Sequence, residues 1–131
     1  MTPSANNVDR VSVGMPLYRY KGQVLNVVDG DTVDVEIDLG FGVVKHERVR
    51  LAGVNTPELH SKDAKEKAAA TTARQFTADW VAAHAEVFLR TEKEQEKYGR
   101  YLAWVEGGDG ASLNDELVKS GNAVTYWGGA R

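Results

Sequence analysis

A run of alternating apolar and polar side chains, from Thr32 to Asp38, places the strongest constraint on the fold of this chain. Its apolar members are Val33, Val35 and Ile37, and a polar residue stands between each pair and at either end. A period of two residues is typical of a β-strand with one buried face, and it does not suit a helix. The run therefore predicts a strand whose three aliphatic side chains enter the core.

Turn signals flank this strand on both sides. The apolar residues 24–28 lead into the turn Asp29-Gly30-Asp31, and a hairpin loop is predicted at residues 39–42. A third strand follows, with Val43, Val49 and Leu51 on one face and His46, Arg48 and Arg50 on the other. Three strands joined by short turns favour an antiparallel meander.

The second half of the chain mixes helices with short strands. Residues 61–85 are rich in Ala, Lys and Glu and contain no Gly or Pro, which predicts a long helix. We expect five of its residues to face the sheet: Ala69, Ala73, Phe76, Trp80 and Ala83. Short strands are predicted at 87–89 and 101–105, a helix at 112–120 capped by Ser112 and ended by Gly121, and an extended segment at 122–127.

This element order predicts an α+β domain that is mainly β, a small five-stranded OB-type barrel with two or three helices. A chain of 131 residues fits one such domain. We assign residues 1–16 to a flexible N-terminal lead-in, 17–127 to the barrel domain and 128–131 to a C-terminal tail.

Composition narrows the chemistry and the setting. The chain has no cysteine, so it can form neither disulfides nor thiolate metal sites, and its three histidines lie far apart without zinc spacing. The net charge is −3, so the chain does not have the overall positive charge that is typical of a tight, non-specific nucleic-acid binder. A bound cation can still supply local positive charge. With no signal peptide or membrane span in view, we expect a cytoplasmic monomer without membrane contact.

Three clusters carry candidate chemistry: VVDGDTV at 27–33, RVRLAGVNTPE at 48–58 and EKYGRYLAW at 96–104. In order and spacing they resemble the signatures of the staphylococcal nuclease family, which read DGDTV, then R-L-x-x-V-D-T-P-E, then K-Y-G-R. The resemblance extends from about residue 24 to residue 126. It implies that the barrel predicted over residues 17–127 is a nuclease-type OB domain.

The resemblance implies a calcium site made of oxygen ligands. A lone aspartate in a turn is usually only a turn residue, but the family position of Asp31 is a carboxylate ligand of calcium. Thr56 matches a position whose backbone carbonyl binds the metal. Asn55 is a departure, because the family has Asp there. An amide oxygen can still bind a cation, but with one negative charge fewer we expect weaker affinity or a changed metal preference. We expect Asp29 to order the turn.

Three residues match the catalytic positions of the family. Glu58 matches the glutamate that orients or deprotonates the attacking water, since a placed carboxylate can accept a proton from that poor nucleophile. Arg50 and Arg100 match the two catalytic arginines, whose guanidinium forks can hold phosphate oxygens as charge develops in the transition state. Arg48 is expected at the rim of the site or in an ion pair.

Four further residues match substrate-contacting positions of the family. Lys97 and Tyr98 fall where the family contacts the terminal phosphate of its substrate. Tyr126 and Trp127 fall near aromatics that stack on or border a base. For this last pair, packing in the core is an equally good interpretation.

The leading hypothesis is a calcium-dependent nuclease acting on single-stranded or locally open DNA or RNA. By resemblance, its products would carry a 5′-hydroxyl and a 3′-phosphate. The alternative is a catalytically weak or inactive OB-type module that only binds nucleic acid. The presence of Arg50, Glu58 and Arg100 favours the enzyme, whereas Asn55 favours the module. The sequence leaves the choice between DNA and RNA open.

Overall fold

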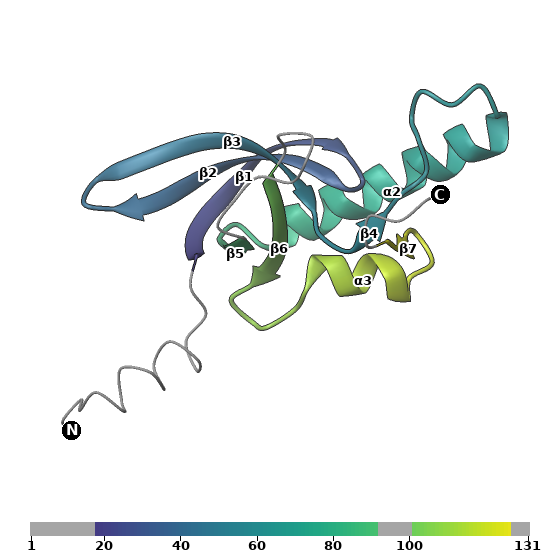
Figure 1. The fold of residues 1–131 in the computed structure, drawn as a ribbon. Coiled ribbons are helices and arrows are strands. Elements are labelled where there is room, and N and C mark those ends of the chain that lie inside the picture. Colours follow the sequence, from purple (N-terminus) through teal and green to yellow (C-terminus); the bar gives the residue numbers. More distant parts are fainter. Residues whose placement is uncertain (1–17, 92–100, 127–131) are drawn as a thin grey trace.

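The computed structural model describes residues 18–91 and 101–126 of the chain, and its centre is a closed five-stranded barrel (Figure 1). The strands are β1 (Arg19–Asp29), β2 (Thr32–Gly40), β3 (Val43–Leu51), β5 (Val87–Thr91) and β6 (Tyr101–Gly107), closed in the order β1-β2-β3-β6-β5. The predicted five-stranded OB-type barrel is therefore confirmed. The proposed lead-in at 1–16 and tail at 128–131 lie outside the described residues.

The pairing of β3 with β6 closes the barrel. It is parallel, from Val49↔Tyr101 to Leu51↔Ala103, whereas the other four pairs of neighbouring barrel strands are antiparallel. A parallel pair needs a long crossover, and here the crossover contains β4 (Val54–Asn55), α2 (Ala64–Ala83) and β5. Strand β4 follows the end of β3 directly along the chain, and this segment contains the second motif.

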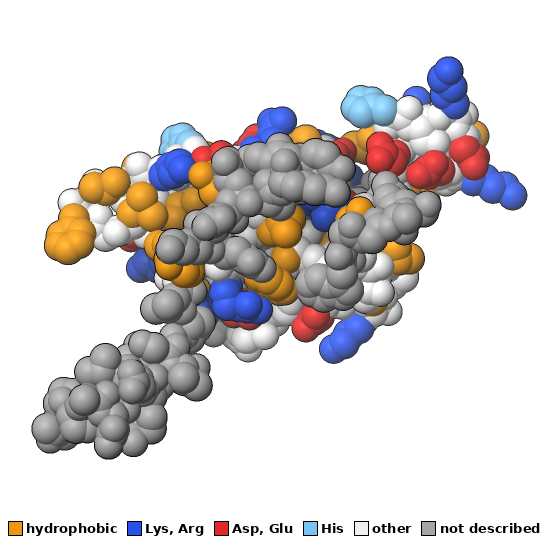
Figure 2. All heavy atoms as spheres, viewed as in Figure 1, with side chains coloured by type: hydrophobic (Ala, Val, Ile, Leu, Met, Phe, Trp, Pro, Cys, Tyr) orange, Lys and Arg blue, Asp and Glu red, His pale blue; other side chains and the backbone are white. Residues whose placement is uncertain are grey.

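The alternating run in β2 supplies the centre of the core, as predicted. Val33 and Val35 are fully buried and Ile37 nearly so, packed with Val49 and Leu51 of β3. Beyond the barrel the β2–β3 hairpin continues into solvent, and its tip carries exposed hydrophobic side chains, including a fully exposed Phe41 (Figure 2).

Helix α2 is shorter than predicted and turned slightly from the predicted orientation. It begins at Ala64 because the Asp63 carboxylate caps it, accepting a hydrogen bond from the amide of Lys65 at 2.9 Å. Its buried residues are Ala70, Ala73, Thr77 and Trp80. Ala69 and Ala83, which we expected to face the sheet, are exposed, because the buried stripe follows the helical spacing from Ala70. Phe76, which was also predicted to face the sheet, is only partly buried and packs against the core.

The C-terminal segment closes one side of the barrel. Helix α3 (Leu113–Lys119) is capped by Ser112, whose hydroxyl accepts from the amide of Asp115 at 3.2 Å, as predicted. The extended segment that follows forms β7 (Val124–Thr125), which pairs with β4 in a separate two-stranded sheet. Within the described ranges, neither helix is long and apolar enough to cross a bilayer.

His84 ends α2 and connects it to the turn after β6. Its Nδ1 donates to the carbonyl of Trp80 at 2.7 Å, its ring stacks on the Trp80 ring at 3.9 Å, and its Nε2 lies 3.2 Å from the Asp109 carboxylate. The hydrogen bond to the Trp80 carbonyl raises the pKa of His84, and Asp109 adds to this effect, while burial opposes it.

This raised pKa predicts that His84 stabilises the fold more at low pH. Its contribution is fully present below the unfolded-state pKa of about 6.5 and is lost as the pH rises through the higher folded-state value. We expect the difference in unfolding free energy between wild type and His84→Ala to be larger at low pH than at high pH. Urea titrations across the pH range measure it. The Asp109→Asn variant should show a reduced pH dependence, and an equal His84→Ala difference at all pH values would contradict the assignment.

Candidate functional site

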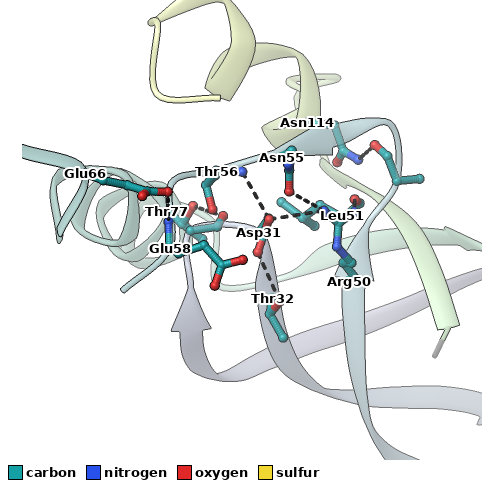
Figure 3. Close-up of polar contacts among 12 residues, drawn as sticks. Asp31, Thr32, Arg50, Leu51, Asn55, Thr56, Glu58, Glu66, Thr77 and Asn114 are labelled. Atoms are coloured by element: carbon teal, nitrogen blue, oxygen red, sulfur yellow. Dashed lines mark hydrogen bonds and ion pairs between the residues drawn. The ribbon is translucent and has the colours of Figure 1, made fainter. Parts of the chain in front are cut away.

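One cavity of about 220 Å³ brings together all the predicted site residues that lie within the described ranges. It lies where the β1–β2 turn, the end of β3, β4 and the segment after β4 meet, and Figure 3 shows its polar contacts. Its lining residues are Asp29, Asp31, Thr32, Arg50, Asn55, Thr56, Pro57, Glu58 and Tyr126. The first two motifs, which are separated along the chain, therefore form one site.

Asp31 is the anchor of this site and is nearly buried, with 8% of its surface exposed. Its Oδ2 accepts hydrogen bonds from the amide of Thr56 at 3.1 Å and from Nη2 of Arg50 at 3.4 Å. Its Oδ1 accepts from the hydroxyl of Thr32 at 3.2 Å, and its backbone carbonyl accepts from the amide of Leu51. These contacts fix the carboxylate against the segment that contains the second motif.

Arg50 places a positive charge between two of the predicted metal ligands. Its Nη2 donates to the Asn55 side-chain oxygen at 2.7 Å as well as to Asp31, so both oxygens face one point in the cavity (Figure 3). A cationic group is thus already held by oxygens that suit a hard cation such as Ca²⁺. Residues 18–91 and 101–126 contain no group of three His, Cys, Asp or Glu that could hold a metal. Among the described residues, the side-chain oxygens that could hold such a cation here are those of Asp31 and Asn55, and the part of the Thr56 carbonyl stays a prediction.

Asp29 adds a second carboxylate to the cavity. Burial raises its pKa, and the negative charges of Asp31 and Glu58 raise it further, while His60 and Arg74 act in the opposite direction. Asp29, Asp31 and Glu58 all line the cavity, where Arg50 is the described cation. Among the described lining residues, negative charges therefore outnumber positive ones, an arrangement that favours binding of a further cation.

The Asp29-Gly30-Asp31 turn is held in place by α2. Thr77, fully buried, donates from its hydroxyl to the Gly30 carbonyl at 2.7 Å, and Arg74 donates to the carbonyls of Val27 and Val28. A Cβ on Gly30 would lie only 3.0 Å from Ala73 and from Thr56, which explains the glycine at the centre of the motif. Our sequence reasoning missed Thr77. The sequence feature that could have indicated Thr77 is a hydroxyl side chain on the buried face of a helix.

We expect Thr77→Val to destabilise the protein by roughly 1–2 kcal/mol, because it leaves the buried Gly30 carbonyl without its hydroxyl partner. Cleavage activity should fall with it, since the same turn carries Asp31. Urea unfolding measures the first effect. Thr72→Val is the matched control, because the Thr72 hydroxyl is exposed and contacts only the Ala68 carbonyl of the same helix. Equal costs for the two variants would contradict this role of Thr77.

Glu58 lies at the open side of the cavity. In Figure 3 its carboxylate points toward the same space as Asp31. Glu66 of α2 organises this loop, because its carboxylate accepts from the Ser61 hydroxyl at 2.7 Å and from the Glu58 amide at 3.4 Å. The side chain of Glu58 is exposed, so solvent water can reach it.

The remaining predicted residues divide into two groups. Tyr126 lines the cavity with its ring 5.6 Å from the Arg50 guanidinium, and its amide donates to the Gly53 carbonyl. Arg48 forms the expected ion pair, at 2.7 Å from Asp34 on the outer face of β2. Four predicted site residues lie outside the described residues, and their roles stay predictions: Lys97, Tyr98, Arg100 and Trp127.

Comparison with known proteins agrees with this geometry. A family model described as staphylococcal nuclease homologue matches residues 48–129. The thermonuclease of Staphylococcus intermedius is 37% identical over 76% of this chain and 56% of its own length. The micrococcal nuclease of Shigella flexneri and an uncharacterized protein of Methanocaldococcus jannaschii are each 34% identical over 82% of this chain and 59% of their own. The chain thus spans a little over half the length of these relatives.

Proposed function

Since this chain belongs to the staphylococcal nuclease homologue family, we propose that it is a metal-dependent nuclease that hydrolyses phosphodiester bonds of DNA, RNA or both. The observation that supports this most strongly is the convergence of Asp31, Arg50 and Glu58 on one cavity beside Asn55 and Thr56. The substrate we propose is a single-stranded or locally open strand, cleaved to leave a 3′-phosphate.

The side chains of the cavity would divide the work as follows. Arg50, already inside the cavity, would donate to the non-bridging oxygens of the scissile phosphate and stabilise the charge that develops there. Glu58, exposed at the mouth, would accept a proton from the attacking water. Arg100 would supply a second guanidinium. To reach the phosphate, Arg50 would exchange its hydrogen bonds to Asp31 and Asn55 for bonds to the substrate.

Asp31, Asn55 and the Thr56 carbonyl would hold the cation, and Ca²⁺ is our proposal because all these donors are oxygens. When bound, the cation would neutralise negative charge on the phosphate. Asp31 is well suited to this position, because the Thr56 amide and the Thr32 hydroxyl keep its carboxylate fixed.

Digestion of end-labelled oligonucleotides tests the proposal. Single-stranded DNA and RNA are incubated with the protein in Ca²⁺, with and without a chelator, and the product termini are analysed. Cleavage that yields 3′-phosphates and stops with the chelator supports the nuclease. Binding without cleavage in Ca²⁺, Mg²⁺ and Mn²⁺ would instead support the inactive nucleic-acid-binding module.

That second candidate has one observation in its favour. The neutral Asn55 oxygen accepts a short hydrogen bond from Arg50, at 2.7 Å, where a carboxylate would offer the metal a full negative charge. A cation would have to displace Arg50 from the Asn55 oxygen, and this neutral oxygen is a weaker metal ligand than a carboxylate.

We therefore predict that Asn55→Asp lowers the Ca²⁺ concentration needed for half-maximal cleavage, because the added carboxylate attracts a divalent cation more strongly than it attracts Arg50. Cleavage rates across a Ca²⁺ titration measure this. The control is Asn122→Asp, which adds the same charge at a residue whose side chain makes an exposed contact with Ser120. If Asn55→Asp required as much Ca²⁺ as wild type, Asn55 would not be a ligand.

A further inference from the structure

The outer face of β1, β5 and β6 carries cations and aromatic rings in adjacent rows. Cross-strand pairing places Arg19, Arg90 and Trp104 in one row and Lys21, Phe88 and Glu106 in the next. The alternate residues of β5 and β6, including Val87, Leu89, Ala103 and Val105, are buried in the core, so the side chains of the two rows face outward. In Figure 2, Lys or Arg side chains lie beside hydrophobic ones on the face that carries β6.

Two of these cations stack on the rings. The Arg90 guanidinium lies 4.2 Å from the centre of the Trp104 ring, and the Arg19 guanidinium lies 4.6 Å from that of Phe88. Arg19 is partly neutralised by Glu106 at 3.7 Å. Arg90 forms no ion pair with any residue in the described ranges. The indole orients this guanidinium on the outer face of β5 and β6.

This face continues directly from the candidate active site. Arg50 of β3 pairs with Leu102 of β6, and Trp104 stands two residues further along the same outward face of β6. Strand spacing and rise place the Cα atoms of Arg50 and Trp104 about 8 Å apart. A strand whose phosphate occupied the Asp31 cavity would pass beside Trp104 if it continued over β6.

A second cavity, of about 210 Å³, opens beside Trp104 between α3 and the β4–β7 sheet. The side chains of Val54, Val118 and Trp104 give it apolar walls, and Asp115 and Lys119 add one negative and one positive charge at the surface. A flat, largely apolar body such as a nucleic-acid base matches these walls.

We propose that Trp104 and Arg90 form a stacking site for an unpaired base of a single-stranded nucleic acid whose phosphate lies in the Asp31 cavity. The inference rests on the proposed nuclease function, because it takes the position of the strand from that cavity. Ring faces and guanidinium planes stack on any base, so the site binds without sequence preference. A protein partner would not need the two features that coincide here, a cation stacked on a half-buried surface ring and a neighbouring phosphate site.

Binding of labelled oligonucleotides in the presence of a chelator tests the site without cleavage. Fluorescence anisotropy would compare wild type with Trp104→Leu, Trp104→Phe and Arg90→Gln, using a ten-nucleotide deoxythymidine strand. We expect Trp104→Leu and Arg90→Gln each to weaken binding about 10-fold, and Trp104→Phe to retain part of the affinity. Arg48→Gln is the matched control, because Arg48 is paired with Asp34 and should bind as wild type does.

A strand of the same length with abasic sites separates stacking from charge. Trp104→Leu should bind this strand as wild type does, whereas Arg90→Gln should still bind it more weakly. Thermal unfolding of each variant shows whether it folds. If Trp104→Leu does not fold, the binding of Arg90→Gln and Trp104→Phe still tests the stacking site.

Equal affinity of wild type, Trp104→Phe and Arg90→Gln for the thymidine strand would overturn the stacking site, even if the protein cleaves DNA. Conversely, weaker binding by these variants in a protein that cleaves nothing would support the stacking site and refute the nuclease. In an active protein, Trp104→Phe and Arg90→Gln should raise the KM for the ten-nucleotide strand and leave kcat close to that of wild type.

Discussion

The Glu58→Gln variant is expected to cleave single-stranded DNA at least about 100-fold more slowly than wild type, at saturating Ca²⁺. A glutamine keeps the size of the side chain but cannot accept the proton of the attacking water. Initial rates on an end-labelled oligonucleotide measure the effect. Its fold should be unchanged, because the Glu58 side chain is exposed and the carboxylate that organises the loop is that of Glu66.

Glu36→Gln is the matched control for this change. Glu36 lies on the outer face of β2 and pairs with His46 at 2.8 Å, outside the cavity. We expect it to cleave at the rate of wild type. A Glu58→Gln variant that also cleaved at that rate would remove Glu58 from the mechanism.

Asn114→Ala is expected to cost about 3 kcal/mol of unfolding free energy, the largest loss of stability that we predict. Asn114 is 3% exposed and joins three segments. Its Oδ1 accepts from the Val105 amide at 3.0 Å, and its Nδ2 donates to the carbonyls of Ala52 at 2.8 Å and Ala103 at 3.2 Å. Truncation leaves buried backbone groups of β6 and of the β3–β4 connection without this partner, together with a small cavity.

Urea unfolding of Asn114→Ala and Asn122→Ala compares a buried with a half-buried asparagine. Asn122 donates to the Ser120 hydroxyl at the surface, so its truncation should cost less than about 0.5 kcal/mol. Because the Ala52 carbonyl lies between the end of β3 and the Asn55 position, Asn114→Ala should also reduce cleavage at temperatures where it is still folded. Equal costs for the two variants would contradict the role given to Asn114.

Local patterns predicted the elements of this fold better than their exact faces. The alternation in β2 was sufficient to predict which face is buried, because a period of two places all the apolar side chains on one face. Val33, Val35 and Ile37 are all buried. In α2 the many alanines give no contrast between faces, so the sequence does not distinguish Ala69 from Ala70. Helix α2 begins at Ala64 and not at the predicted Ser61, because its N-cap is Asp63. Composition alone does not indicate which residue caps the helix.

Long-range pairing was beyond the reach of these patterns. Nothing local in Val49 or Tyr101 indicates that β3 and β6 pair in parallel. Strands β4 and β7 have two residues each, and no local pattern predicts them. They form because the C-terminal segment comes back beside the residues that follow β3. Five residues that the resemblance singled out, Asp31, Arg50, Asn55, Thr56 and Glu58, line one cavity, and their roles there stay predictions.

The contacts that support the site could not be predicted from the motifs. The hydrogen bond from Arg50 to Asn55, the buried link from Thr77 to Gly30 and the position of Asp29 in the cavity depend on the packing of α2 and β3 against the turn. Asn114 offered a weak signal, as a polar residue next to Leu113 on the face that α3 buries.

Cleavage of single-stranded DNA in ¹⁸O-labelled water, with Ca²⁺ present, tests the central claim most directly. If water attacks phosphorus in the Asp31 cavity, mass spectrometry will find one ¹⁸O in each new 3′-phosphate and none in the 5′-hydroxyl fragment. Label in a 5′-phosphate, or intact DNA with every divalent cation tried, would contradict it.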